Sequence, residues 1–508
     1  MKNVNPLLAV DISDESETHA LAEDLAVILL PGDVVALSGT LGAGKTTFCR
    51  AVLRALAKDD ELEVPSPTFT LVQPYALERL EVAHFDLYRL SDPDELIELG
   101  FDDQISDAVS LIEWPDKAGD FLPSDTLWVS IETGMEDGKR KFRFFGDAEK
   151  WRERITRSAR IREFLNGNGW PSARRHFLQG DASYRQYEVI SDGGRTAILM
   201  NAPERPLDPI VKDGRAYSEI ANITRTVHPF IAIDIALAQA KLRVPALLGT
   251  DLDAGLLLLE HLGDQTIAKD GRPVAERYLA AIDILAFHHS RSWPDMLPMP
   301  DGTHYQVPSY DRDALMIEVE IFLDWYVAQE RQEQIAHGPR RRFLGCWSTL
   351  IDILSGAERS LVLRDFHSPN LLWRPGEKGN DRIGLIDFQD AVIGPSAYDL
   401  GSLVYDARVT IEPNLRDELI ARYCAVRELL GAAVDEEELR KSLAIAAAQR
   451  ITKIAGLFIR LSNRDGKKQY LAHLPRVFDY LEHCLTHPVL SDLKACYEEE
   501  GWIDANRI

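Results

Sequence analysis

Residues 34–46 read VVALSGTLGAGKT, and this stretch decides the fold of the first part of the 508-residue chain. The apolar run at its start predicts a short buried strand over residues 34–37. Residues 39–46, GTLGAGKT, then match the pattern G-x-x-x-x-G-K-[ST]. Glycines in this pattern let backbone N–H groups turn toward a phosphate, and the helix that follows adds a favourable dipole. The stretch therefore predicts a nucleotide-binding α/β domain.

The side chains of this loop indicate how it would hold the nucleotide. Lys45 places a positive charge on the β- and γ-phosphates, and the Thr46 hydroxyl can bind Mg²⁺. An ordinary glycine-rich turn is the alternative, but a strand precedes the loop and a helix follows it. The predicted nucleotide-binding residues of the loop are Gly39, Gly42, Gly44, Lys45, Thr46 and Thr47.

The rest of the first part alternates between strand-like and helical stretches. Helical spacing of apolar residues is found at 16–29 and 93–99, and strand-like runs are found at 68–73, 82–88, 108–113 and 127–131. Strands that alternate with helices predict a mostly parallel α/β sheet. The segment 138–160 is basic and helix-prone, so we place the domain boundary near residue 150 and the first domain at residues 1–150.

The second part has a different order of elements. Strand-like segments at 184–190 and 195–200 come first, and helices dominate from there to the C-terminus. A small β-rich lobe followed by a larger helical lobe is the order expected of a bilobal, protein-kinase-like α+β fold. We place this domain at 157–508, with its small lobe at about 172–262 and its helical lobe at about 263–508.

A magnesium and phosphate site is predicted in the helical lobe. Residues 363–370, LRDFHSPN, contain the pattern D-x-x-x-x-N, and the sequence IDF follows at 386–388. In the kinase template, Asp365 would orient the acceptor hydroxyl and take its proton, while Asn370 and Asp387 would hold Mg²⁺. A predicted hairpin between these motifs folds Asp387 back toward Asp365. The pattern D-x-x-x-x-N alone arises by chance, but the strand and Asp-Phe that follow make it specific.

Two upstream segments would complete this second site. Residues 179–187, QGDASYRQY, lie where a loop that covers ATP phosphates belongs, with an ordinary hairpin turn as the alternative. Gly180 permits a close approach of the backbone, and Ser183 and Arg185 can donate hydrogen bonds to phosphate. Glu260 ends the next apolar strand, at the place where a hinge would contact adenine.

Composition narrows the class of protein. The chain has 57 Lys and Arg against 81 Asp and Glu, a formal net charge of −24, which argues against wide contact with nucleic-acid phosphates. A local basic patch or a nucleic-acid-binding partner stays open. We find no run of 18 apolar residues and no signal peptide at the start, so we expect a cytoplasmic protein that does not cross a membrane. The cysteines lack metal or redox spacing, as is typical of reduced thiols: Cys49, Cys346, Cys424, Cys484 and Cys496.

Four ordered motifs of the first domain resemble one family. They are GTLGAGKTT at 39–47, VPSPTFTLV at 64–72, HFDLYRL at 84–90 and LIEW at 111–114. Together they resemble the TsaE family, the small ATPase of bacterial tRNA threonylcarbamoyladenosine synthesis, over about residues 1–148. The resemblance implies ATP hydrolysis that supports TsaB- and TsaD-like partner proteins, with the tRNA handled by those partners.

The TsaE resemblance also implies roles for four residues. Thr68 would lie in a switch near the γ-phosphate, and Asp86 would act on Mg²⁺ or on the attacking water. Glu113 would be a second acidic residue at a strand end, with Trp114 close to the nucleotide. Three of them have a plain alternative when taken alone: a surface or capping role for Asp86, turn chemistry for Thr68 and core packing for Trp114.

The second domain resembles the aminoglycoside phosphotransferase superfamily. Within it, five segments are similar to AmgK, the anomeric kinase of cell-wall amino sugars: GDASYRQY at 180–187, LMNAPE at 199–204, LRDFHSPNLLW at 363–373, IDFQDAVIGP at 386–395 and QRITKIAGLFIRLSNRDGK at 449–467. The Asp-Phe-Gly of protein kinases is absent, because Gln389 follows Phe388. The resemblance implies transfer of the γ-phosphoryl of ATP to the anomeric hydroxyl of N-acetylmuramate or N-acetylglucosamine, in the recycling of peptidoglycan sugars.

One departure from the kinase pattern keeps alternatives open. The strand at 195–200 ends in Met200, where most kinases place the Lys that pairs with phosphate, and Arg185 is our candidate for the missing positive charge. A non-catalytic nucleotide sensor is one alternative. A kinase for an aminoglycoside or another hydroxylated small molecule is a second. For the first domain, the alternative is a binding module whose slow ATPase only times assembly.

Overall fold

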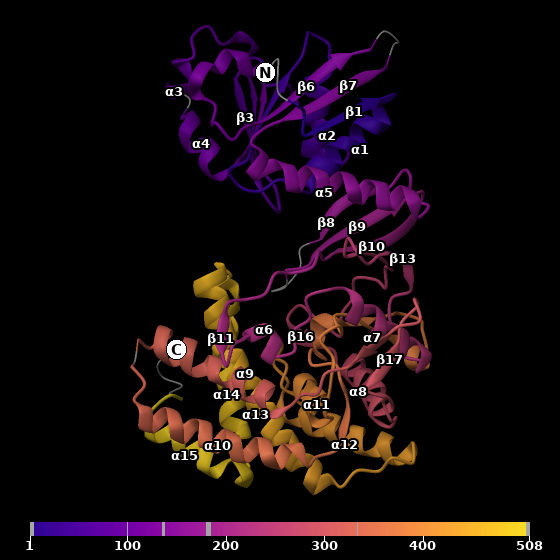
Figure 1. The fold of residues 1–508 in the computed structure, drawn as a ribbon, viewed down its shortest axis with the longest axis vertical. Coiled ribbons are helices and arrows are strands. Elements are labelled where there is room, and N and C mark those ends of the chain that lie inside the picture. Colours follow the sequence, from indigo (N-terminus) through magenta and orange to yellow (C-terminus); the bar gives the residue numbers. More distant parts are fainter. Residues whose placement is uncertain (1–4, 99, 135–137, 179–183, 333, 504–508) are drawn as a thin grey trace. The chain divides into compact units, whose positions relative to one another are not determined.

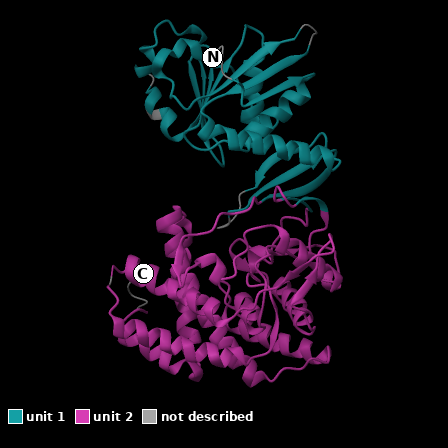
Figure 2. Ribbon diagram, viewed as in Figure 1, with its two compact units in different colours: residues 1–201, 248–251, 256–259 teal, residues 202–247, 252–255, 260–508 magenta. Residues whose placement is uncertain are grey.

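The computed structural model describes residues 5–98, 100–134, 138–178, 184–332 and 334–503. The chain divides into two compact units (Figure 2). The first unit contains residues 1–201, 248–251 and 256–259, and the second contains residues 202–247, 252–255 and 260–508. The small-lobe sheet therefore groups with the first unit, and the domain boundaries inferred from the sequence stay predictions.

A seven-stranded sheet organises the first part of unit 1 (Figure 1). Its strands, in spatial order, are β1 Leu8–Ile12, β7 Arg140–Phe145, β6 Leu127–Thr133, β2 Val34–Ser38, β5 Val109–Glu113, β4 Glu81–Asp86 and β3 Val72–Ala76. The central strands β6, β2, β5 and β4 run parallel, and antiparallel pairs close both edges. The predicted α/β fold with its mostly parallel sheet is confirmed.

Side-chain alternation along β2 explains why helices cover both faces of this sheet. Val35 and Leu37 belong to one core cluster with Phe48, whereas Val34 belongs to another with Phe101. Because successive residues of a strand point to opposite faces, each face requires its own cover. The helices of this part are α1 Glu15–Ala26, α2 Lys45–Ala57, α3 Glu95–Glu98 and α4 Phe101–Asp107, with 3₁₀ turns at Leu87–Arg89 and Pro115–Phe121.

Two local predictions are wrong in the first domain. The run 68–73 is a turn until β3 begins at Val72, because prolines flank the loop and its hydroxyl side chains bond to Asp86. The segment 140–145, taken as part of a helix-prone stretch, is strand β7. Its alternate residues Phe142 and Phe144 are buried, which is the period of a strand.

Helix α5, Ala148–Gly167, leads from the seven-stranded sheet to a second sheet in the same unit (Figure 1). The Asp147 side chain caps its first turn by accepting a hydrogen bond from the Lys150 N–H. The second sheet is antiparallel where its registers are resolved, and both strands predicted at its start are confirmed. Its strands, in spatial order, are β13 Leu247–Asp251, β14 Leu256–Glu260, β10 Arg195–Asn201, β9 Gln186–Asp192 and β8 Arg174–Leu178.

A cluster of charged side chains joins α1 to β8 and α5. The Arg175 guanidinium is fully buried, donating to Glu188 at 2.7 and 2.8 Å and to Asp24 at 2.7 Å. Asp24 also accepts from Arg162 of α5 at 2.7 Å. Arg174 donates to Glu23 at 2.8 Å. We call these six side chains the α1–β8 cluster. Two of them belong to α1 and are bonded to two arginines of β8, so ion pairs as well as packing hold α1 against β8.

Unit 2 is mostly helical, as the sequence predicts for the larger lobe. Its helices are α6 Tyr217–Ile220, α7 His228–Gln239, α8 Ala275–His289, α9 Arg312–Ile321, α10 His337–Ser355, α11 Ala397–Val404, α12 Pro413–Leu429, α13 Glu436–Asp465, α14 Leu474–Cys484 and α15 Ser491–Glu499. A π-helical turn, Phe322–Glu330, continues α9. Short paired strands complete the unit: β11 Ile210–Lys212 with β12 Arg215–Ala216, β15 Ala268–Lys269 with β16 Arg272–Pro273, β17 Met296–Pro298 with β18 His304–Gln306, β19 Arg359–Val362 with β22 Val392–Pro395, and β20 Leu371–Trp373 with β21 Ile383–Leu385.

Helix α13 packs against α9, α11 and α14 in the core of unit 2. Among the described residues, it is the one helix long and apolar enough to cross a membrane, and 83% of its most apolar window is buried in the protein. Gly456 brings its backbone against α9, since a Cβ there would lie 2.5 Å from the Ile321 carbonyl oxygen. This helix is therefore a core element of unit 2.

Candidate functional sites

The phosphate-binding loop lies between β2 and α2, and its backbone requires glycine at two positions. A Cβ at Gly39 would lie 2.6 Å from the Ile131 carbonyl oxygen, and Gly44 has a left-handed φ of 106°. Gly42 lies between these two positions in the loop, and Thr47 lies in the first turn of α2. The start of α2 therefore presents free N–H groups and the positive end of its dipole at this loop.

The side chain of Lys45 is hydrogen-bonded to the backbone of its own loop. Its Nζ donates to the carbonyl oxygens of Gly39 at 2.9 Å and Thr40 at 3.0 Å, and lies 3.6 Å from the centroid of the Trp114 ring. Burial lowers the pKa of Lys45, although Glu113 and Asp86 oppose this effect. The ammonium group is thus kept at the mouth of the loop, where a phosphate would compete for it.

The two acidic residues predicted for this site end neighbouring parallel strands. Asp86 on β4 is in register with Glu113 on β5, and Glu113 is in register with Leu37 on β2. Because parallel strands share one carboxyl edge, both carboxylates reach the end of the sheet where the loop begins. Sequence alone could not give this register.

Hydrogen bonds fix both carboxylates. Asp86 Oδ2 accepts from Ser66 Oγ at 2.7 Å and from Thr68 Oγ1 at 2.9 Å. Glu113 Oε2 accepts from Thr46 Oγ1 at 2.7 Å. The predicted switch residue therefore contacts the predicted metal and water residue directly. Carboxylate and hydroxyl oxygens are the ligands that Mg²⁺ prefers, so these residues fit that ion.

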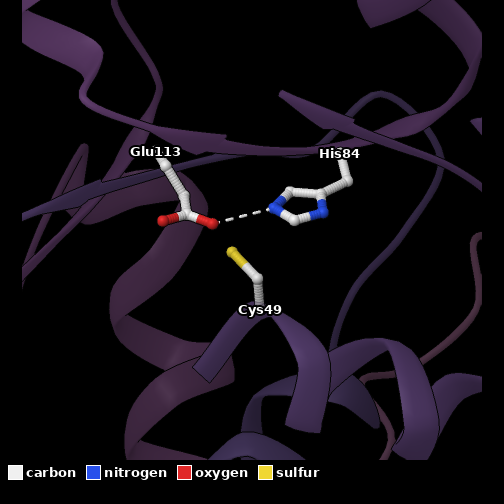
Figure 3. Close-up of side chains that lie close together, drawn as sticks. All are labelled: Cys49, His84 and Glu113. Carbon is white, nitrogen blue, oxygen red and sulfur yellow. Dashed lines mark hydrogen bonds and ion pairs between the residues drawn. The ribbon is translucent and has the colours of Figure 1, made fainter. Parts of the chain in front are cut away.

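A histidine that sequence reasoning missed lies behind Glu113. His84 Nε2 is 3.0 Å from Glu113 Oε1, and Cys49 lies beside both side chains (Figure 3). All three residues are buried. His84 and Asp86 are two residues apart on β4 and so share a face, which is the signal that the sequence offered. Ser66 was missed as well, because a serine between two prolines resembles ordinary turn chemistry.

The second site lies in unit 2, after strand β19. Asn370 Nδ2 donates to the Asp365 carbonyl oxygen at 3.0 Å and lies 3.5 Å from Asp387 Oδ2. Gln389 Nε2 donates to Asp387 Oδ1 at 2.9 Å. The structure thus brings Asp365, Asn370 and Asp387 together, and the hairpin of β20 and β21 returns Asp387 as predicted. The carboxylates and the amide oxygen again fit Mg²⁺.

The backbone of the loop that carries Asp365 is held from α11. Asp399 accepts hydrogen bonds from the N–H groups of Leu363 at 2.7 Å and Arg364 at 2.8 Å. Burial raises the pKa of Asp399 to about 6. Arg364 adopts a left-handed φ of 67°, and its guanidinium is paired with the buried Glu318 of α9.

A cation on α13 faces the carboxylate of Asp365. Arg450 Nη2 lies 3.3 Å from Asp365 Oδ1, and the Asp365 side chain is 41% exposed while that of Arg450 is 5% exposed. Burial alone would raise the pKa of Asp365, but the Arg450 guanidinium and other neighbouring cations outweigh burial and hold it well below its usual range. Asp365 is therefore ionised at neutral pH. Arg450 belongs to the QRITK stretch, where no spacing rule pointed to it.

The remaining predicted nucleotide-binding residues are only partly placed. Gly180 and Ser183 lie outside the described residues. Arg185 is buried, with its guanidinium 5.1 Å from the Tyr184 ring. The Glu260 side chain is paired with Arg243 and accepts the Ala246 N–H at 3.1 Å, and its contact with adenine stays a prediction. Met200 is buried in β10.

The chain is similar to known proteins along most of its length. Residues 12–142 match the family model of the threonylcarbamoyl adenosine biosynthesis protein TsaE, and residues 174–436 match that of the phosphotransferase enzyme family. The N-acetylmuramate/N-acetylglucosamine kinase of Caulobacter vibrioides is 34% identical over 367 residues, which make up 69% of this chain and 98% of that kinase. A kinase of the same name from Pseudomonas aeruginosa is 31% identical, across 65% of this chain and 90% of the relative.

The first part has relatives of its own. The tRNA threonylcarbamoyladenosine biosynthesis protein TsaE of Rickettsia felis is 39% identical over 129 residues, which make up 25% of this chain and 74% of that protein. Two families thus account for two separate stretches of sequence, each with its own phosphate-handling residues. The chain belongs to the TsaE family in its first part and to the phosphotransferase enzyme family in its second, fused in one polypeptide.

Proposed function

We propose that this chain is a bifunctional enzyme. Its first part hydrolyses ATP in support of tRNA threonylcarbamoyladenosine formation. Its second part transfers the γ-phosphoryl group of ATP to the anomeric hydroxyl of N-acetylmuramate or N-acetylglucosamine. The names and coverage of the relatives support both assignments. The cluster of Asp365, Asn370 and Asp387 is the observation that carries the kinase assignment.

In the first part, the loop and its neighbours would perform hydrolysis by positioning and charge. Lys45 exchanges its carbonyl partners for the β- and γ-phosphates, and Thr68 lies against Asp86, which orients the attacking water. Bound Mg²⁺ would be held through Thr46, Asp86 and Glu113, and would neutralise charge on the phosphates. Trp114 closes the nucleotide side of Lys45.

In the second part, Asp365 accepts the hydrogen bond of the anomeric hydroxyl and so aims its oxygen at the γ-phosphorus. The new O–P bond forms as the bond to the β-phosphate oxygen breaks, ADP leaves, and the hydroxyl proton passes to Asp365. A strongly ionised carboxylate is a weak base, which suits a loose transition state in which the proton moves late. Asn370 and Asp387 would hold Mg²⁺, which supplies charge neutralisation.

The partners and the location follow from the same proposal. TsaB- and TsaD-like proteins would bind the first part, and these partners would bind the tRNA. That arrangement agrees with the net charge of −24, which does not favour direct binding of a polyanion. The second part needs only ATP and an amino sugar. We place the protein in the cytoplasm, where both nucleotide pools and recycled sugars are found.

Phosphate transfer from labelled ATP to a panel of amino sugars and aminoglycosides tests the kinase assignment. We expect a sugar 1-phosphate from the wild type and a loss of about 10²-fold or more in Asp365→Asn, because the hydroxyl loses its orienting carboxylate. Lys45→Ala is the matched control: it should abolish nucleotide binding in the first part and leave sugar phosphorylation intact.

Three outcomes would count against the proposal. Equal transfer by Asp365→Asn would remove Asp365 from catalysis. Transfer to aminoglycosides alone would replace the proposed substrate class. No transfer at all, with nucleotide still bound, would favour the nucleotide sensor that Met200 suggests.

For the first part, Lys45→Ala should also abolish threonylcarbamoyladenosine formation in a reconstituted mixture with TsaB- and TsaD-like proteins and tRNA.

A further inference from the structure

The side chain of His84 makes one polar contact among the described residues, and that contact is to Glu113. The imidazole is fully buried in β4; its Nε2 lies 3.0 Å from Glu113 Oε1, and its Nδ1 has no hydrogen-bond partner. A carboxylate oxygen only accepts, so Nε2 carries the proton and donates it. Figure 3 shows the ring aimed at Glu113 from the neighbouring strand.

Glu113 is thereby fixed at both of its oxygens. His84 donates to Oε1, and the Thr46 hydroxyl donates to Oε2 at 2.7 Å. The carboxylate cannot rotate without breaking one of these bonds. Because the Thr46 hydrogen is committed to Glu113, the lone pairs of its oxygen are left for a ligand on the phosphate side. One line of hydrogen bonds thus runs from a buried strand to the first turn of α2.

We propose that His84 is a positioning residue of the ATPase site: it orients Glu113, and through Glu113 the Thr46 hydroxyl, for the Mg²⁺–ATP complex. The inference rests on the ATPase activity proposed above and assigns to it a residue outside the phosphate-binding loop. Residues that support metal ligands from behind typically contribute about 10- to 100-fold to metal affinity or activity.

The neighbouring Cys49 offers a competing interpretation. Ligand atoms of Cys49, His84 and Glu113 lie within 4.8 Å of one another, so the three could hold a transition metal by composition. Burial, with the nearby carboxylates, raises the pKa of the Cys49 thiol well above its usual value, so without a metal ion the sulfur is an uncharged thiol. A structural zinc site takes four ligands, whereas this cluster offers three.

Binding of ATP to the full chain with and without Mg²⁺ tests the proposal independently of turnover. All variants carry Asp387→Ala in addition, which removes metal-dependent ATP binding at the second site. The double variant Lys45→Ala/Asp387→Ala gives the residual ATP binding, which is subtracted. We expect His84→Ala to bind ATP as the parent does in EDTA but to lose about tenfold of the affinity gained with Mg²⁺. The Mg²⁺ concentration for half-maximal hydrolysis should rise by a similar factor.

Two further variants separate positioning from packing and from metal binding. The Nε2 of glutamine stands at the same number of bonds from Cβ as that of histidine, so His84→Gln should recover affinity to within about threefold of the parent. Cys49→Ala removes a neighbour that donates nothing to Glu113 and should leave the Mg²⁺ dependence unchanged. Circular dichroism melting of each variant checks that the fold persists.

Loss of ATP affinity by His84→Ala to the same extent in EDTA and in Mg²⁺ would overturn the inference, since that pattern indicates general disruption. Equal damage from Cys49→Ala, with a stoichiometric transition metal found by elemental analysis of the wild type, would replace it with a metal site. If the wild type does not hydrolyse ATP, or does so without Mg²⁺, the proposed ATPase function itself is refuted. If the wild type shows Mg²⁺-dependent hydrolysis and His84→Ala has the same Mg²⁺ dependence, only the role of His84 is refuted.

Discussion

At the scale of single residues, the charge behind Asp365 sets how the kinase would respond to pH. The carboxylate is open to solvent on one side and faces the buried Arg450 on the other. A carboxylate must be ionised to accept the acceptor hydroxyl's proton. Its pKa is held low mainly because Arg450 and nearby cations favour the charged form against the effect of burial.

Replacement of Arg450 by glutamine should therefore move the acidic limb of the pH–rate profile. Without the guanidinium, the charged form of Asp365 loses the cation that favours it most, so its pKa rises and activity is lost at a higher pH than in the wild type. We expect a shift of about one to three pH units in the acidic limb of kcat/KM for the sugar. Arg464→Gln, which removes an arginine from the exposed last turn of the same helix, is the control and should leave the profile in place. Superimposable profiles for Arg450→Gln and the wild type would contradict this account.

At the scale of elements, the approach of α13 to α9 has little tolerance. Gly456 faces the Ile321 carbonyl oxygen, where α9 passes into the π-helical turn. The atoms nearest to a Cβ at Gly456 are backbone atoms, which cannot move aside as a flexible side chain could. Residues packed so closely transmit any added volume to the backbone of both helices. The same helix carries Arg450, so its position also decides the geometry around Asp365.

Gly456→Ala should destabilise unit 2 although alanine is the better helix former. The added methyl group would lie 2.5 Å from the Ile321 oxygen, and relief of that overlap should cost about 1–3 kcal/mol. Gly345→Ala in α10 is a matched control, because nothing lies within 4 Å of a Cβ there. It should stabilise by about 0.5–1 kcal/mol through helix propensity alone. Thermal unfolding of the full chain measures both, and equal shifts in the two variants would refute the packing argument.

Local patterns were readable from the sequence, and contacts across elements were not. The strand, loop and helix around Lys45 lie within one stretch, so composition and spacing were enough to predict them. Arg143 and its basic neighbours led to a helix prediction for β7, although the alternation of Phe142 and Phe144 has the period of a strand. The pairing of His84 with Glu113 depends on the register of two strands. The contact of Arg450 with Asp365 joins residues 85 positions apart, and no local rule reaches that far.

At the scale of the whole molecule, the two parts of the fusion are joined by ion pairs as well as by the continuous chain. The α1–β8 cluster sets two carboxylates of α1 against Arg162, Arg174 and Arg175, with Glu188 as the remaining acid. Removal of one partner from such a cluster leaves a buried charge without compensation, which costs far more than the loss of an exposed pair. The first unit should accordingly unfold as one body.

Asp24→Asn tests this joint in the intact chain. The substitution removes the carboxylate shared by Arg162 and Arg175 and should destabilise unit 1 by about 1–3 kcal/mol. Asp60→Asn removes the partner of Arg174 at an exposed position, where solvent screens the pair, and should cost about 0–1 kcal/mol. Urea unfolding followed by circular dichroism compares the two. Identical midpoints would show that the cluster does not join the elements.

The same cluster bears on the history of the gene. A break of the coding sequence ahead of α5 would give a separate kinase with three arginines and a single acid at the face that α1 now covers. Such a product would need compensating substitutions before it could be as soluble and stable as the joined form. Separation would therefore take several mutational steps, a break of the chain together with substitutions at these charges, so the cluster favours retention of the joined form.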